Sequence, residues 1–165
     1  MAYIGLISDT HGVFDDKLRK FLEPVDEIWH AGDFGNIETA DAIAAFKPLR
    51  GVYGNCDDHT VRLAHPYTQF FEMDGMRILM MHIGGYPGRY DFKAFQLINA
   101  HLPDIFICGH SHILKVINDP KYRVLTINPG AAGIQGFHNV RTALRFRIEN
   151  GTIKDMEVGE WERKL

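Results

Sequence analysis

Short apolar runs that end in glycine-containing turns constrain the fold of this chain more than any other feature. The run Ile105-Phe106-Ile107-Cys108 ends at Gly109 and is followed by His110 and His112. Such a run is typical of a buried strand in a sheet that is covered on both faces. The two imidazoles therefore follow the carboxyl end of a strand, where open α/β sheets place their ligands.

The spacing of these two histidines suggests a metal site. On nearly extended backbone, residues i and i+2 point to the same side, so the two imidazoles are expected to converge on one point. Converging neutral imidazoles are typical metal ligands. Paired surface histidines are also common, and this stretch alone leaves both interpretations open.

The same construction recurs after four other predicted strands. The further donors are Asp9 with His11, Asp33, Asn55 and His82. By itself, a residue at such a position is more often a helix cap, a turn residue or a hydrogen-bonded histidine at the sheet edge than a metal ligand. Seven oxygen or nitrogen donors at the same end of five neighbouring strands would nevertheless be a large coincidence, and the sequence predicts that they meet.

The order of the predicted elements indicates an α/β fold. A βαβαβ unit comes first and implies parallel strands with right-handed crossovers. A hairpin about Asp74-Gly75, a helix, the 105–112 stretch and antiparallel strands follow. The expected strands are 3–8, 27–30, 49–53, 68–73, 77–81, 105–108, 114–117, 122–127, 142–148 and 152–158, and the expected helices are 16–23, 37–46 and 91–101. We expect one domain over residues 1–165, with two mixed sheets face to face and helices outside.

Composition excludes several classes of function. The net charge of −3 over 165 residues gives no reason to expect a nucleic acid polymer or an anionic membrane as partner. No apolar run approaches the roughly 20 residues that span a bilayer. The two cysteines, Cys56 and Cys108, provide no disulfide framework and fit a reducing compartment, so a cytoplasmic location is expected.

Seven donors exceed the needs of one ion. Mixed carboxylate, amide and imidazole ligands suit a pair of divalent ions, as in two-metal hydrolases. Such a pair needs a bridging carboxylate that offers its two oxygens to two ions, and Asp33, alone on its turn, is the natural candidate. Because the set contains no thiolate, Mn²⁺, Fe²⁺, Zn²⁺ or Ni²⁺ is expected.

These residues together resemble a known family. The segments that carry the likeness are Asp9-Thr10-His11, Gly32-Asp33, Gly54-Asn55-Cys56-Asp57, His82 and Gly109-His110-Ser111-His112. Their order and spacing resemble the calcineurin-like metallophosphoesterases, in particular the small bacterial and archaeal phosphodiesterases. The resemblance implies a four-layer α/β/β/α sandwich and two divalent ions, with Mn²⁺ as the first expectation.

The resemblance also implies roles for the residues. Asp9, His11 and His112 would hold one ion, Asn55, His82 and His110 the other, and Asp33 would bridge them. Asn55, Cys56 and Asp57 would be the catalytic residues. The implied activity is hydrolysis of a small phosphodiester by a hydroxide shared between the ions, and Thr10 and Ser111 would act as turn or supporting donors.

Cys56 departs from the family pattern. Many members have histidine at this position, where it stabilises or protonates the leaving oxygen. A thiol with an ordinary pKa of about 8.5 is a poorer acid at neutral pH than an imidazolium. We therefore expect a preference for acidic leaving groups, or a proton donor elsewhere, for which His59 and His138 are candidates. Cys56 as a small packed residue without a catalytic role is an equally open interpretation.

Two alternatives belong to other functional classes. The fold could serve as a non-catalytic scaffold, as in the retromer subunit that resembles these enzymes, but here all seven ligand positions hold competent donors. A phosphomonoesterase is a second alternative. A nuclease that acts on long chains is disfavoured, because no basic stripe or interleaved aromatic residues are present. Exposed apolar groups could support a homo-oligomer.

Overall fold

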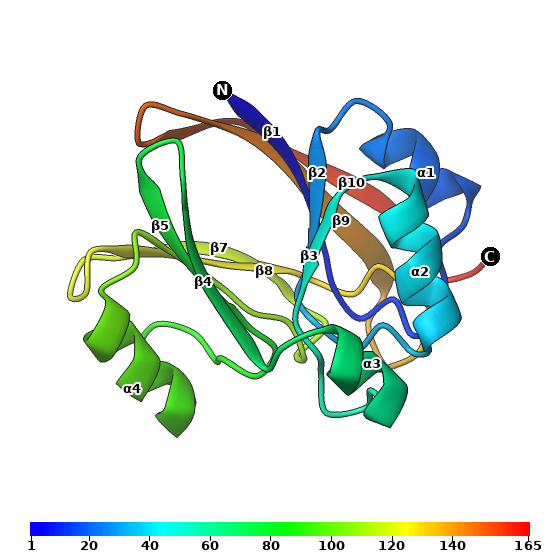
Figure 1. Ribbon diagram of the computed structural model, residues 1–165, viewed down its shortest axis with the longest axis horizontal. Coiled ribbons are helices and arrows are strands. Elements are labelled where there is room, and N and C mark those ends of the chain that lie inside the picture. Colours follow the sequence, from blue (N-terminus) through cyan, green and yellow to red (C-terminus); the bar gives the residue numbers. More distant parts are fainter.

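Two five-stranded mixed sheets face each other in the structure, a computed structural model that describes residues 1–165 (Figure 1). The first sheet has the order β10-β9-β1-β2-β3 and the second the order β4-β5-β6-β8-β7. The strands are β1 (Ala2–Ile7), β2 (Glu27–His30), β3 (Leu49–Gly51), β4 (Thr68–Met73), β5 (Met76–Met81), β6 (Ile105–Ile107), β7 (Leu114–Asp119), β8 (Val124–Pro129), β9 (Val140–Glu149) and β10 (Thr152–Glu162).

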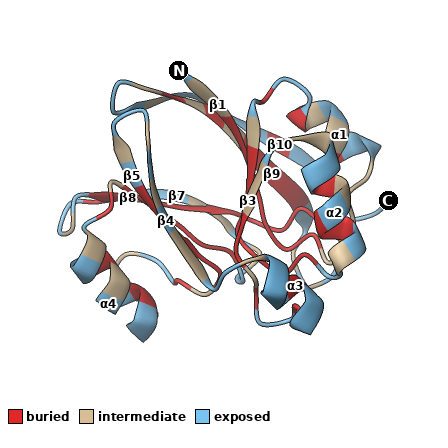
Figure 2. Cartoon of the chain, viewed as in Figure 1, coloured by how far each residue is buried: buried red, intermediate tan, exposed pale blue.

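Alternating side chains divide the apolar core into three layers. In β1, Ile4 and Leu6 point into the core between the sheets, whereas Ile7 packs under the helices of the first sheet. In β5, Ile78 belongs to the core between the sheets and Leu79 to the layer next to the helix of the second sheet. Because each sheet is apolar on both faces, a helical layer must cover each outer face. Figure 2 shows the buried strands inside and the exposed outer faces of the helices.

The helices complete a four-layer α/β/β/α sandwich, which confirms the predicted fold. Helices α1 (Asp16–Leu22) and α2 (Ile37–Phe46) lie on the first sheet, and α4 (Phe92–His101) lies on the second, at the opposite side of the molecule (Figure 1). As expected, Asn36 caps α2, where its side chain accepts the backbone N–H of Thr39. No helix is long and apolar enough to cross a membrane.

Helix α3 (His59–Ala64) was not predicted from the sequence. It has only six residues and buries only Val61, so it has almost no apolar stripe for periodicity to reveal. Asp58 caps it, where its side chain accepts the N–H of Val61. The helix follows directly on the turn that carries Asn55, Cys56 and Asp57.

The two Asx-Gly turns are confirmed. Asp74 and Gly75 both have positive φ and join β4 to β5 through a two-residue loop. Asn150 and Gly151 join β9 to β10 in the same way. Strand β10 is longer than predicted and reaches Glu162, because its pairing with β9 continues to Glu162 opposite Val140. Trp161 packs edge-on against Phe21 of α1 at a ring distance of 5.7 Å.

Candidate metal centre

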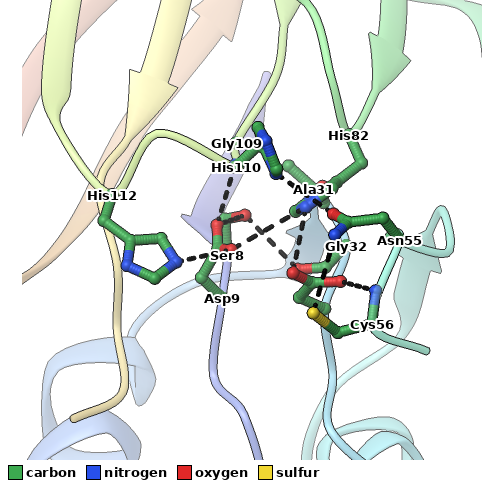
Figure 3. Close-up of polar contacts among 12 residues, drawn as sticks. Ser8, Asp9, Ala31, Gly32, Asn55, Cys56, His82, Gly109, His110 and His112 are labelled. Atoms are coloured by element: carbon green, nitrogen blue, oxygen red, sulfur yellow. Dashed lines mark hydrogen bonds and ion pairs between the residues drawn. The ribbon is translucent and has the colours of Figure 1, made fainter. Parts of the chain in front are cut away.

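The predicted donors meet at one edge of the sandwich, but they come from both sheets. The turns after β1, β2 and β3 belong to the first sheet, and those after β5 and β6 belong to the second. The prediction of five neighbouring strands is therefore corrected to two sets of neighbours, three strands and two, that face each other. Among the donors labelled in Figure 3, Asp9, Asn55, His82, His110 and His112 point toward one another from turns of both sheets.

The acidic and imidazole donors form two groups of three. Asp9, His11 and His112 make one group, and Asp33, His82 and His110 make the other; within each, the ligand atoms lie within 4.8 Å of one another. Asn55 extends the second group, since its Oδ1 lies 3.1 Å from His110 Nδ1. This is the grouping that the family resemblance implies.

In each carboxylate, one oxygen is held by the surrounding structure and the other faces imidazoles. Asp9 Oδ2 accepts the Ser8 hydroxyl and the His110 backbone N–H, while Oδ1 lies 3.1 Å from His112 Nε2 and 3.6 Å from His11 Nε2. Asp33 Oδ1 accepts the Cys56 N–H at 2.9 Å, and Oδ2 lies 3.6 Å from His11 Nε2 and 3.1 Å from His82 Nε2.

Asp33 thus lies between the two groups, but not as the sequence argument predicted. A bridging carboxylate was expected to offer one oxygen to each ion. In the structure the backbone of Cys56 occupies Oδ1, so only Oδ2 faces His11 of one group and His82 of the other.

The tautomer of His82 leaves a lone pair facing the carboxylates. Its Nδ1 donates a proton to the carbonyl of Ala31 at 2.7 Å, so Nε2 of the neutral ring carries none. Nε2 is buried without a hydrogen-bond partner, and so is Nε2 of His11. A nitrogen lone pair next to a carboxylate oxygen is unfavourable unless a cation lies between them.

The close approach of imidazoles and carboxylates also shifts the pKa values of His11, His82 and Asp9. The pKa of His11 is raised chiefly by Asp9. Burial opposes protonation of His82, yet Asp33 and Asp9 outweigh it and raise its pKa. Burial likewise opposes ionisation of Asp9, but His11 and His112 hold its pKa below the ordinary range. The carboxylates therefore favour a positive charge between themselves and the imidazoles, and a proton supplies it when no metal is bound. The same donors fit divalent ions, which would replace these protons.

Five of the seven donors have left-handed backbone. The φ values are 53° for Asp9, 45° for His11, 60° for Asp33, 72° for His110 and 63° for His112. Non-glycine residues seldom adopt this region, and clusters of such residues occur at functional sites. The expectation that His110 and His112 lie on extended backbone and converge on one point is therefore wrong, and the turn sends them to different groups.

Asp57 differs from its predicted catalytic role. Its Oδ2 accepts the N–H groups of Asp33 and Gly54, and its Oδ1 accepts that of Gly35. These three bonds turn the buried carboxylate toward the backbone of the turns after β2 and β3. Asp57 is therefore a positioning residue that holds Asp33 against the turn of Asn55.

Sequence reasoning missed His30, which joins the first two turns. Its Nδ1 accepts the Gly32 N–H at 3.0 Å, and its Nε2 lies 3.0 Å from Thr10 Oγ1, which in turn donates to the carbonyl of Phe34. The ring stacks on Phe34 at 3.7 Å, and burial lowers its pKa to about 3. The available signal was a histidine as the last residue of a buried strand. Because His30 belongs to the strand and not to the turn that follows, the sequence pattern indicates a core residue.

Of the three proposed proton donors, only Cys56 lies at the centre. Its Sγ lies 3.6 Å from Asn55 Nδ2, and burial together with the charge of Asp33 raises its pKa. His138 packs edge-on against His112, but its Nε2 proton is donated to the carbonyl of Gly133. His59 begins α3 and makes no hydrogen bond or ion pair with the seven donors.

Comparison with known proteins identifies the family. Residues 3–151 match the family described as the calcineurin-like phosphoesterase superfamily domain. The chain belongs to this superfamily, which supports a hydrolase of phosphate esters that uses divalent metal ions.

Individual proteins are similar to this chain in sequence or in fold. A probable metallophosphoesterase of Methanothermobacter thermautotrophicus is 29% identical over 138 residues, which cover 78% of this chain and 76% of that protein. The fold is similar to that of Vps29 from Chaetomium thermophilum, with a TM-score of 0.73 at 17% identity over 98% and 97% of the two chains. It is also similar to a structure described as a novel archaeal phosphodiesterase, with a TM-score of 0.70 at 21% identity over 94% and 99%.

Proposed function

We propose that this protein is a phosphodiesterase that hydrolyses a small phosphodiester with two divalent ions. The observation that carries the proposal is the pair of donor groups, Asp9-His11-His112 and Asp33-His82-His110, with Asn55 beside the second and Asp33 between them. The buried Nε2 atoms of His11 and His82, which have no hydrogen-bond partner, support it further.

The charge of this site suits a phosphate ester. Two divalent ions would carry about +4 against the two carboxylates of Asp9 and Asp33, which leaves a net positive centre for a phosphate oxyanion. When bound, such ions stabilise charge on phosphate oxygens and make water a stronger nucleophile at neutral pH. Manganese is the first metal to test, followed by zinc, nickel and iron.

The residues of the chain hold this arrangement in advance. The Asp57 carboxylate accepts the backbone N–H of Asp33 and so fixes that turn. The carbonyl of Ala31 accepts the Nδ1 proton of His82 and so fixes its tautomer. Asn55 presents its amide at the edge of the second group, where Oδ1 faces His110 and Nδ2 donates to Cys56. The raised pKa of Cys56 keeps its thiol protonated and so a weak nucleophile, and direct attack by water is the proposed route.

A chromogenic assay tests the proposal. We expect the protein with added Mn²⁺ to hydrolyse bis(p-nitrophenyl) phosphate faster than p-nitrophenyl phosphate, and EDTA to abolish the activity. Asp33→Asn should lose at least about 10²-fold in kcat/KM, because a ligand between the two groups is weakened. His101→Asn, on α4 away from the centre, is the matched control.

Two outcomes would favour the alternatives. Faster hydrolysis of the monoester would indicate a phosphomonoesterase. A folded protein that binds Mn²⁺ but cleaves neither ester, also with Zn²⁺, Ni²⁺ or Fe²⁺, would indicate a scaffold.

A further inference from the structure

A cavity of about 420 Å³ lies directly beside the second donor group. It is formed by the loop after β5, the turn after β6 and the start of β7, and His110 is part of its wall. Its polar and charged lining residues are Tyr86, Arg89, Asp91, His110, Ser111, Lys115 and Asn128. A group attached to a phosphate at the metal centre can therefore extend into this cavity.

Ser111 offers this cavity a hydroxyl proton. Its Oγ accepts two hydrogen bonds, from the backbone N–H of Ile113 at 3.2 Å and from Asn128 Nδ2 at 3.0 Å. Asn128 is itself fixed, because its amide also donates to the carbonyl of Gly109 and accepts the N–H of Gly130. Since both lone pairs of the Ser111 oxygen are occupied and its proton has no acceptor within the protein, the hydroxyl is set up to donate.

Two cations of the cavity also lack an acidic partner. No carboxylate lies within 4.0 Å of the charged groups of Arg89 or Lys115, as for most lysines and arginines of the chain, so both positive charges remain available to a ligand in the cavity. Lys115 Nζ instead lies 3.5 Å from the centre of the Tyr86 ring, which orients the ammonium through a cation–π contact.

The acidic group of the cavity is already engaged in capping. Asp91 Oδ2 accepts the N–H of Lys93 at the start of α4. The lining has two positive charges, on Arg89 and Lys115, against the one negative charge of Asp91. Such a lining favours an anion.

We propose that this cavity binds a second phosphate group of the substrate, so that the substrate class is a phosphodiester bearing an additional phosphate. The inference rests on the proposed function, because the metal centre holds the phosphate that is cleaved. Arg89 and Lys115 bind the additional phosphate with the Ser111 hydroxyl, while Tyr86, Ile83 and Ile113 contact the organic part between the two phosphates.

Two matched probes test this inference. Thymidine 5′-(p-nitrophenyl phosphate) and its 3′-phosphorylated form differ only in the second phosphate, and both release p-nitrophenolate. We expect kcat/KM to be at least about tenfold higher for the 3′-phosphorylated probe, because hydrogen bonds to charged groups contribute that much or more. The preference should weaken with added salt.

Substitution assigns the preference to the cavity. In the double variant Arg89→Met and Lys115→Met, the ratio of the two kcat/KM values should fall to within about twofold, since no cation remains to bind the second phosphate. Lys17→Met, on α1 outside the cavity, should keep the wild-type ratio. A wild-type ratio near one, or a ratio that the double variant leaves unchanged, would overturn the inference while the proposed function stands.

Binding provides a readout that does not require turnover. With Mn²⁺ present, calorimetry should show tighter binding of thymidine 3′,5′-bisphosphate than of thymidine 5′-monophosphate, and the double variant should lose the difference. If neither probe is cleaved, the proposed function fails, and this comparison still decides about the cavity. Equal affinities for the two nucleotides would contradict the inference.

Discussion

His30 and His82 are both buried at the ends of strands, yet their pKa values move in opposite directions. Burial lowers the pKa of His30 to about 3, and the Nδ1 lone pair of the neutral ring accepts the N–H of Gly32. Asp33 and Asp9 raise that of His82. His30 is thus neutral and connects two turns, whereas His82 faces carboxylates that favour a cation at its ring. The difference arises from which atoms face each ring.

The neutrality of His30 predicts a pH dependence of folding. Between pH 6.5 and about 3, His30 is protonated in the unfolded chain and neutral in the folded protein. This residue therefore contributes stability that is lost as pH falls through that window. In EDTA, urea unfolding of the wild type should show a steeper loss of stability on acidification than His30→Phe, which cannot titrate.

The variant also tests the hydrogen bonds of His30. At pH 8 the phenylalanine variant should be less stable by about 1–3 kcal/mol, because the Gly32 N–H and the Thr10 hydroxyl lose their partner. His101→Phe, on α4, is the control and should show neither effect. Identical pH slopes for His30→Phe and the wild type would contradict the assigned role.

Cys56 predicts a leaving-group preference. Its pKa is raised by burial and by Asp33, so the thiol donates a proton less readily than an imidazolium would. Cys56→His should raise turnover of diphenyl phosphate relative to bis(p-nitrophenyl) phosphate, by up to about 10²-fold, because the poorer leaving group gains more from a proton donor. Steady-state kinetics on the two esters measures this ratio.

Cys56→Ala separates donation from packing. If the thiol has no catalytic role, alanine should match the wild type on both esters. A histidine variant with an unchanged ratio would count against the idea that position 56 serves the leaving group.

At the scale of elements, Arg141 connects helix α1 to the sheet and to the centre. Its guanidinium on β9 is fully buried and donates to both oxygens of Asp15 at 2.9 Å and to the carbonyl of Ala132 at 2.8 Å. Ala132 in turn donates its N–H to Ser8, next to Asp9. Asp15 also caps α1 by accepting the N–H of Leu18. One ion pair therefore fixes the helix and the loop behind the first donor group.

Two variants of Asp15 separate these contributions. Asp15→Asn keeps a cap but removes the charge, and should destabilise the protein by about 2 kcal/mol because the buried guanidinium loses its partner. Asp15→Ala should cost about 1 kcal/mol more through loss of the cap. Urea denaturation measures both.

Asp58 provides the matched control, since it caps α3 through Val61 without an ion pair. Asp58→Asn should leave stability within about 0.5 kcal/mol of the wild type. An Asp15→Asn variant of equally unchanged stability would show that Arg141 does not depend on this partner.

At the scale of the whole molecule, the candidate centre exists only in the folded chain. Its donors lie from Asp9 to His112 and reach one another only when both sheets are packed. A ligand that binds only the folded state stabilises it by mass action. Mn²⁺ at about 100 times its dissociation constant should therefore add about 2.7 kcal/mol for one ion and raise Tm by about 5–10 °C.

Thermal unfolding with and without EDTA measures this shift. Asp33→Asn should reduce the shift, whereas His101→Asn should retain it. A melting temperature that does not respond to Mn²⁺, Zn²⁺, Ni²⁺ or Fe²⁺ would argue against a metal centre at this edge.

The sequence by itself determined most of the helices and strands and the place of each donor along the chain. Asp74-Gly75 and Asn150-Gly151 turn the chain through local backbone preferences. Alternation in β1 and β5 fixes which side chains enter which layer, since the period of a strand is local. The recurrence of Asp, Asn and His after buried strands is also a local pattern, so the sequence reveals it. Helix α3 was missed because six residues are too few to show a helical period.

The tertiary structure decided how the donors divide and what holds them. That His110 and His112 belong to different groups follows from left-handed backbone at both residues, which their spacing does not reveal. The roles of Asp57 and His30 depend on backbone N–H groups of neighbouring turns, and the cavity of Arg89 and Lys115 depends on packing around the second sheet. Strand periodicity and turn type depend on a few consecutive residues, so the sequence reveals them. The direction of a buried polar side chain depends on atoms that are distant in sequence and that only folding brings near it.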